Sequence, residues 1–176
     1  RYAGVTHLDV TKFDRAQAAR TLEIAAEAQV AISGLGYYPN ALSHDSAEAA
    51  IAVEHLRRVI AAAPLLGLSR VNTFIGRDWT QSVAANWPRF LETWRPLIKL
   101  AEDHGVKIAL EAHPGFIVYN VETALRLRKA VGDTVGVNFD PSHYFWQGVD
   151  VPAAIRALGP AIFHMHAKDV ALDPQN

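Results

Sequence analysis

The sequence predicts an α/β protein built on a parallel β-sheet. Short apolar and β-branched runs alternate with longer Ala- and Leu-rich stretches that have helical spacing. The short runs are almost continuously apolar, which is typical of strands buried on both faces of a parallel sheet. Their carboxyl ends lie 26 to 40 residues apart, a spacing that suits βα units with modest loops. No linker-like stretch divides the chain, so we expect residues 1–176 to form one domain.

The first half of the chain contains two predicted helix–strand pairs. A helix is predicted over Asp14–Ala28, because its first residue is an aspartate suited to N-capping. The run QVAISGLGY predicts a strand over Gln29–Tyr37. A second helix is predicted over Ser46–Gly67, which begins with a serine followed by a glutamate and ends at a glycine. The run RVNTFIG predicts the next strand over Arg70–Gly76.

The second half contains three further pairs. We predict helices over Ser82–Gly105, Asn120–Gly132 and Val149–Gly159, followed by strands over Val106–Glu111, Thr134–Asp140 and Ala161–Asp169. Each of these helices ends at a glycine, a common helix terminator. Trp87, Leu91 and Trp94 recur at helical spacing and are predicted to lie in the core. This pattern leaves open whether the strands form a barrel or an open sheet, and no GxGxxG nucleotide fingerprint follows any of them.

Composition narrows the classes of partner. The formal net charge is −1, which gives no basic face for nucleic acid or for an anionic membrane, and we expect neither partner. No run of 18 or more apolar residues is present, so no membrane span is predicted. The absence of cysteine excludes disulfides and thiolate ligands and favours a reducing compartment, so we expect a cytoplasmic location.

Three successive predicted strands end in side chains that can bind a metal: Glu111, Asp140 and His166. The carboxyl ends of parallel strands meet at one edge of the sheet, where reactive residues gather. A carboxylate after four apolar residues is costly to bury unless a cation or a donor meets it. A solvated loop carboxylate would explain one such strand, but three neighbouring strands favour a shared divalent cation. Two carboxylates and an imidazole suit Mn²⁺, Co²⁺, Zn²⁺ or Fe²⁺, with Mg²⁺ as a further candidate.

The hexapeptide HMHAKD supplies the histidine of this set. Strand alternation places His164, His166 and Lys168 on one face. His166 lies nearer the rim and is the predicted ligand. His164 is either a hydrogen-bonded core histidine or a site residue, and the sequence leaves both open. Lys168 either pairs with Asp169 or contacts the substrate.

Four other side chains are candidates for contact with the substrate. His143 follows Pro141, which ends the strand and lets the loop fold this histidine back over the site, where it would hold a substrate hydroxyl or support a ligand. His113, two residues after a predicted ligand, is similarly placed. Trp146 would form an apolar wall over a sugar ring or pack on the surface. Arg77 would contact the substrate or pair with the aspartate that follows it.

With these residues, the chain resembles a known family, the sugar phosphate isomerase/epimerase-like proteins with the xylose isomerase-type TIM barrel. The matching stretches are ISGLGYYPNAL, VNTFIGRD, AEDHGVKIALE, VGVNFDPSHYFWQGVD and IFHMHAKD. They cover most of the chain, and the order FDPSH, WQG, HMHAKD is fairly specific. The resemblance implies a (β/α)8 barrel, of which these residues would form a segment.

The resemblance also implies a mechanism. Glu111, Asp140 and His166 would hold one divalent cation, with Mn²⁺ favoured, that grips two adjacent oxygens of a ketose, a sugar phosphate or a keto-cyclitol. Glu111 would remove the proton between them, and His143 would orient a substrate oxygen. A second glutamate on the eighth strand would return the proton from the opposite face. The implied partner is a small sugar or polyol, and a homo-oligomer is compatible with the sequence.

Five clear strands stand where a closed barrel needs eight. We therefore expect the domain to be incomplete at both ends, with two strands before Arg1 and the second glutamate beyond Asn176. The piece Gly4–Val10 would be a sixth strand or, on the family pattern, an approach to the first helix.

Three alternative functions are also compatible with the sequence or with the family fold. A keto-cyclitol dehydratase would share the enolate and differ only in the later step. A non-catalytic sugar-binding protein would keep the barrel without a complete site. An apurinic endonuclease uses the same barrel with three zinc ions, but RVNTFIG has no histidine at its end and the charge balance is neutral, so we disfavour it.

Overall fold

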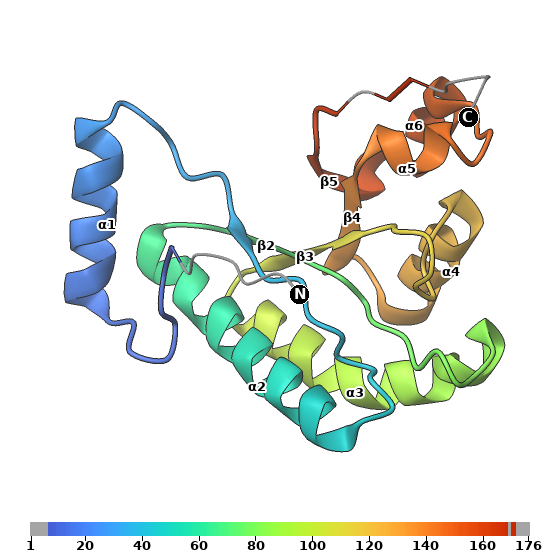
Figure 1. Ribbon diagram of the computed structural model, residues 1–176. Coiled ribbons are helices and arrows are strands. Elements are labelled where there is room, and N and C mark those ends of the chain that lie inside the picture. The colour runs from blue at the N-terminus through green and yellow to red at the C-terminus, as the bar shows by residue number, and fades with distance from the viewer. Residues whose placement is uncertain (1–6, 169, 172–176) are drawn as a thin grey trace.

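The structure, a computed structural model, describes residues 7–168, 170 and 171, and its described part contains one parallel sheet (Figure 1). The strands are β1 (Leu35–Gly36), β2 (Arg70–Thr73), β3 (Lys107–Glu111), β4 (Val135–Phe139) and β5 (Ile162–Met165). They pair in chain order, β1-β2-β3-β4-β5. An open doubly wound sheet reverses its strand order at a switch point, whereas a barrel adds each strand beside the last. The unreversed order therefore supports the barrel, as part of its wall.

Each predicted helix is present among the described residues. The helices are α1 (Arg15–Glu27), α2 (Ser46–Ala62), the 3₁₀ helix η1 (Ala63–Leu66), α3 (Val83–Asp103), α4 (Val121–Val131), α5 (Pro141–Phe145), α6 (Val151–Leu158) and the 3₁₀ helix η2 (Gly159–Ala161). Asp45, rather than Ser46, caps α2, because its side chain accepts hydrogen bonds from the amides of Ala47 and Glu48. Helix α5 was predicted as a loop. It forms because Asp140 caps it and Pro141 occupies its first position, where no backbone donor is needed.

The first strand is much shorter than predicted. Only Leu35 and Gly36 pair with β2, whereas the apolar run suggested a strand from Gln29. Gln29 itself has a positive φ of 54°, which ends α1 rather than starting a strand, and Val30 is exposed. In the candidate strand Gly4–Val10, the described residues 7–10 form no strand, and the rest lies outside the described residues.

The outer face of the sheet packs against the helices. Its core residues are Val71, Ile108, Leu110, Val135, Val137 and Phe139, all fully buried. Figure 1 shows α2 and α3 together on one side of the sheet and α4 beside β4. Trp94 of α3 is fully buried and donates from Nε1 to the carbonyl of Ile75 at 3.0 Å. Trp87 is also buried, so these two tryptophans are core residues as predicted.

The opposite face of the sheet combines small and polar residues. Alternation places Ala109 with Glu111 and Gly136 with Asn138 on this face. A β-bulge between β4 and β5 brings Phe163 against Gly136. A Cβ at Gly136 would lie 2.5 Å from the carbonyl oxygen of Ala161 and 2.6 Å from the ring of Phe163. The absence of a side chain at Gly136 therefore lets β5 approach β4.

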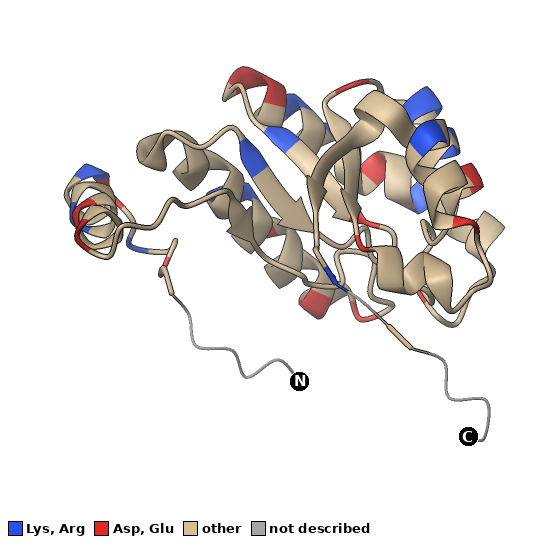
Figure 2. Ribbon diagram, turned by 90° about the horizontal axis from the view of Figure 1, so that it is seen from above, with Lys and Arg blue, Asp and Glu red and all other residues tan. Residues whose placement is uncertain are grey.

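Helix α1 lies to one side of the sheet in Figure 1. Ala18 joins the core, while Leu22 and Ile24 are exposed. Among the described residues, no helix is both long enough and apolar enough to cross a bilayer. Figure 2 shows acidic and basic residues along the same helices, in keeping with the near-neutral net charge.

We predict that Gly136→Ala destabilises the fold by about 3 kcal/mol, because the new methyl group overlaps a backbone carbonyl and a ring. Gly105→Ala is the control. That glycine has open space around its Cβ position but a φ of +64°, so we expect a loss of about 1 kcal/mol from backbone strain alone. Urea unfolding monitored by circular dichroism measures both. Equal losses in the two variants would show that the close approach of β5 does not depend on Gly136.

Candidate functional site

Two carboxylates reach the same point from neighbouring strands. Glu111 is the last residue of β3, and Asp140 follows β4 directly. Their exposed fractions are only 6% and 2%. Burying two like charges side by side is unfavourable unless positive charge and hydrogen-bond donors surround them. The pair is therefore a candidate cation site.

Two histidines face this pair from either side. His143 on α5 places Nε2 at 3.1 Å from Oε1 of Glu111 and 3.6 Å from Oδ2 of Asp140. His166, just after β5, places Nδ1 at 3.6 Å from Oε2 of Glu111 and 3.5 Å from the same Asp140 oxygen. Three adjacent segments of the barrel wall thus bring four metal-capable side chains together.

The donor set fits a single divalent cation. Glu111, Asp140 and His143 each offer a ligand atom, and these atoms lie within 4.8 Å of one another. His166 adds a second imidazole in contact with both carboxylates. Two carboxylate oxygens with imidazole nitrogen suit Mn²⁺, Co²⁺, Zn²⁺, Fe²⁺ or Mg²⁺. The net charge of the two carboxylates would be neutralised by a dication.

The two carboxylate oxygens of Asp140 make different contacts: one caps helix α5, and the other faces the histidines of the candidate site. Oδ1 accepts hydrogen bonds from the amide and the hydroxyl of Ser142, at 3.0 and 2.6 Å. Oδ2 faces the histidines and Nζ of Lys168, which lies 3.3 Å away. Burial opposes ionisation, but the Ser142 hydrogen bonds, His143 and Lys168 outweigh it and hold the pKa of Asp140 below its usual value of 3.8. Asp140 is therefore a carboxylate at neutral pH.

Asn138 connects the site to a deeper polar layer. It is fully buried, and its Nδ2 donates to Nε2 of His166 at 3.0 Å and makes a longer contact of 3.4 Å with the hydroxyl of Tyr38. Its Oδ1 accepts from Nδ1 of His164 at 3.0 Å. Burial, together with the charge of Glu111, raises the pKa of Tyr38 to about 12. Burial, helped by Arg70 and His166, lowers the pKa of His164.

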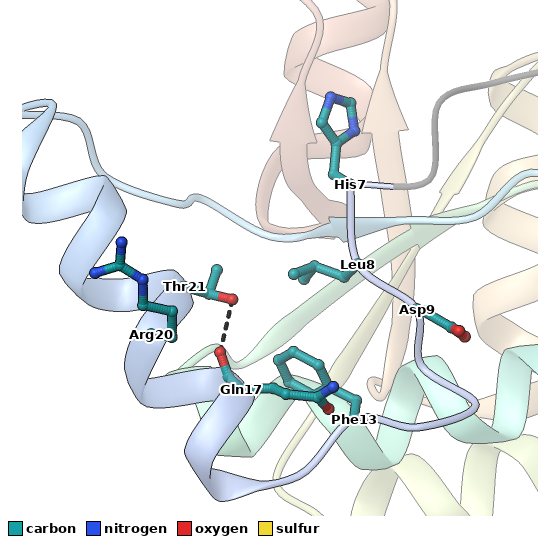
Figure 3. Close-up of a pocket in the computed structure, with 7 residues that line it drawn as sticks. All are labelled: His7, Leu8, Asp9, Phe13, Gln17, Arg20 and Thr21. Atoms are coloured by element: carbon teal, nitrogen blue, oxygen red, sulfur yellow. Dashed lines mark hydrogen bonds between the residues drawn. The ribbon is translucent and has the colours of Figure 1, made fainter.

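A cavity of about 1220 Å³ opens over these residues. It exceeds the usual size of a small-molecule site and is lined by Glu111, Asp140, His143, His166, Lys168, His113, Tyr38 and Phe74, among others. A smaller cavity of about 240 Å³ lies between α1 and the segment before it (Figure 3). His7, Leu8 and Thr21 line both, so the small cavity adjoins the large one.

The structure places two further predicted site residues in the larger cavity, of about 1220 Å³. Lys168 lines it, with a half-exposed side chain directed at Asp140. Its other predicted partner, Asp169, lies outside the described residues. His113 also lines it, with Nδ1 at 2.7 Å from the carbonyl oxygen of Pro114 and its ring 4.3 Å from that of His143.

Two of the residues predicted to contact the substrate, Arg77 and Trp146, are not among those that line the larger cavity. Arg77 donates to the carbonyl oxygens of Gly115 and Gln81, at 3.2 and 3.5 Å. It does not pair with Asp78, which lies 3.6 Å from Arg89 instead. Trp146 follows α5 and is half exposed. Both residues come from loops, whose direction strand alternation does not fix.

The sequence interpretation missed Asn138 and Tyr38. Asn138 had a readable signal, because it stands two residues before Asp140 in an otherwise apolar strand and so shares its face. Tyr38 lies beyond the short strand β1, where the pattern gives no direction. Phe74 was missed as well. It stacks on Phe116 and meets the rings of Tyr38 and His113, forming an aromatic wall.

Comparison with known proteins identifies relatives. The family model described as xylose isomerase-like TIM barrel matches residues 2–176. The uncharacterized protein YfiH of Bacillus subtilis (strain 168) is 54% identical over 81 residues, or 46% of this chain and 26% of YfiH. An inosose isomerase of Bacillus velezensis is 38% identical over 81 residues (44% and 29% of the two chains), and an inosose dehydratase of Glaesserella parasuis is 33% identical over 88 residues (48% and 30%).

Solved structures share the fold. A crystal structure of D-psicose 3-epimerase in the presence of D-fructose superposes with a TM-score of 0.74 at 20% identity, covering 89% of this chain and 59% of that one. The chain thus spans less than two thirds of that structure, and its alignments span less than a third of each curated relative named above.

We predict that Ser142→Ala raises the pKa of Asp140 in the metal-free protein, because it removes the hydroxyl hydrogen bond to Oδ1. A depressed folded-state pKa stabilises the fold above pH 3.8, and this contribution is lost as the pH falls through the folded-state value. The variant should therefore lose this stability at a higher pH than the wild type. Carbon-13 NMR titration of the Asp140 carboxyl measures the shift.

Ser82→Ala is the matched control, because it removes a serine hydroxyl that accepts a hydrogen bond from the amide of Ala85 at the start of α3, away from Asp140. An unchanged Asp140 pKa in Ser142→Ala would contradict the assignment of the shift to this hydroxyl.

Proposed function

This chain belongs to the xylose isomerase-like TIM-barrel family, and from that premise we propose that it is a divalent-metal-dependent isomerase or epimerase of a small ketose, sugar phosphate or keto-cyclitol. The observation that carries the proposal is the buried pair Glu111 and Asp140, flanked by His143 and His166 in a cavity large enough for such a substrate. The relatives named for inosose isomerase and inosose dehydratase activities support a polyol substrate.

Glu111, Asp140 and His166 are the proposed ligands. His166 is preferred over His143 because its Nδ1 is almost equally close to both carboxylates, while its Nε2 is held by Asn138. A metal-ligating histidine usually has such a partner on its other nitrogen. Mn²⁺ is the favoured ion. When bound, the cation would polarise the substrate carbonyl and stabilise the charge of the enediolate.

Glu111 is the proposed base, which takes the proton from the carbon beside the carbonyl. His143 holds its Oε1 at 3.1 Å, so the carboxylate is fixed in direction. His143 also faces the cavity and would orient a substrate oxygen. Return of the proton from the opposite face requires a second acid, which the resemblance assigns to a glutamate on a further strand. Lys168 and His113, both lining the cavity, are proposed to contact substrate oxygens.

Dehydration of a keto-cyclitol is the second candidate, favoured by the inosose dehydratase relative. It begins with the same proton removal, after which a hydroxyl leaves from the neighbouring carbon. Incubation of the protein with inosose in D₂O distinguishes the two. Isomerisation or epimerisation gives a product that keeps all its oxygen atoms and carries deuterium on carbon, whereas dehydration gives a product lacking one water.

We predict that Glu111→Gln lowers turnover by about 10²–10⁴-fold, the usual contribution of a general base. Asp140→Asn should instead mainly weaken Mn²⁺ binding, because it removes a ligand charge and leaves the base in place. Elemental analysis after Mn²⁺ loading gives the stoichiometry, and NMR of the D₂O reaction gives the rate.

Glu122→Gln is the control, since this glutamate is exposed in the first turn of α4. About one Mn²⁺ per chain is expected in the wild type. Full activity of Glu111→Gln on a turned-over substrate would exclude Glu111 as the base, and absence of any bound cation would exclude the proposed chemistry.

A further inference from the structure

Asn138 lies between the two histidines of HMHAKD and contacts one nitrogen of each. Its carboxamide is 3.0 Å from Nε2 of His166 and 3.0 Å from Nδ1 of His164. Strand register explains the contact, because Asn138 of β4 pairs with His164 of β5 and His166 is the next residue on the same face. The carboxamide is fully buried, so water does not replace either contact.

A carboxamide has one accepting oxygen and one donating nitrogen. Whichever way the amide of Asn138 is turned, one histidine nitrogen must donate to it and the other must accept from it. The nitrogens concerned are of opposite kinds, Nδ1 in His164 and Nε2 in His166. If Nδ1 of His164 donates, then Nε2 of His166 accepts, and both neutral rings carry their proton at Nδ1. If Nδ1 of His164 accepts, then Nε2 of His166 donates, and both carry their proton at Nε2.

We infer that Asn138 is a positioning residue that locks His164 and His166 into a shared tautomer and couples that tautomer to occupancy of the cation site. With Oδ1 toward His164, both rings are protonated at Nδ1, and the proton of His166 points at the two carboxylates. With the amide turned by half a revolution, both rings are protonated at Nε2. Nδ1 of His166 then presents a lone pair to the same carboxylates.

The second orientation is the one a cation requires, because a ligating nitrogen must be free of its proton. This step rests on the proposed function, in which His166 binds through Nδ1. The hydroxyl of Tyr38, 3.4 Å from Nδ2, can donate as well as accept, so it opposes neither orientation. The cation would thus turn the amide, and the amide would pass the change to His164, which has no contact with the carboxylates among the described interactions.

The first test uses metal-free protein at a pH well above the ordinary histidine pKa of about 6.5. Nitrogen-15 NMR of the imidazole rings, assigned with His164→Gln and His166→Gln, reports which nitrogen carries the proton. Both rings should be protonated at Nδ1. One ring protonated at Nδ1 and the other at Nε2, or a ring protonated at both nitrogens, would overturn the inference.

The same spectra with Zn²⁺, a diamagnetic probe, test the coupling. Both His164 and His166 should move to the Nε2–H form, although only His166 is a ligand. If Zn²⁺ binds and His164 keeps its tautomer, the coupling is wrong. If no cation binds, the proposed function fails, while the metal-free spectra still decide whether Asn138 pairs the two rings.

Two variants separate this role from packing. Asn138→Leu keeps the volume but removes both polar contacts, so Mn²⁺ affinity measured by calorimetry should fall by about 10–100-fold. Asn138→Asp presents an acceptor to both rings and fixes the Nε2–H form of His166, so it should retain the wild-type affinity. Asn72→Leu is the control, since Asn72 is another buried asparagine of the sheet, and its Oδ1 has no partner in the described structure. Equal Mn²⁺ affinity in Asn138→Leu and wild type, or equal losses in the Leu and Asp variants, would contradict the assignment.

Discussion

The burial of two carboxylates side by side constrains everything around the cavity. Glu111 and Asp140 end neighbouring parallel strands, so the sheet itself brings them together. In a medium of low polarisability, their repulsion is large unless each is met by donors or by a cation. The residues nearest to them are accordingly positive or donating: Ser142, Lys168, His143 and His166. None of these groups alone balances two full charges, whereas the proposed dication would.

Glu111 and Asn138 lie on the inner face of the barrel wall, because strand alternation assigns the outer face to the apolar residues. On β3 and β4 the outward residues are fully buried against α3 and α4, and the inward ones are small or polar. Ala109 and Gly136 precede Glu111 and Asn138 on this face, and Phe163 fills the space beside Gly136. The bulge that admits Phe163 beside Gly136 also sets the register in which His164 meets Asn138. Packing deep in the barrel wall therefore determines which histidine nitrogen faces which polar group at the rim.

The sequence predicted the parts that follow from strand geometry. The parallel sheet and the convergence of Glu111, Asp140 and His166 follow from the rule that strand ends share one edge. The positions of side chains on the connecting segments were harder to predict. His143 folds back as expected, but through a short helix rather than a loop, since Asp140 acts as a cap. Arg77 is directed by tertiary contacts with backbone carbonyls that no local pattern encodes.

Asp140 shows why fold and site cannot be separated here. One oxygen caps α5 through Ser142, and the other faces His143, His166 and Lys168. The cap holds the carboxylate in one rotamer, and the helix that it starts carries His143 to Glu111. A change that kept the charge of Asp140 but moved the cap would thus displace both a proposed ligand and His143 opposite it. The stability of this short helix and the geometry of the proposed cation site therefore depend on the same side chain, each through one of its two oxygens.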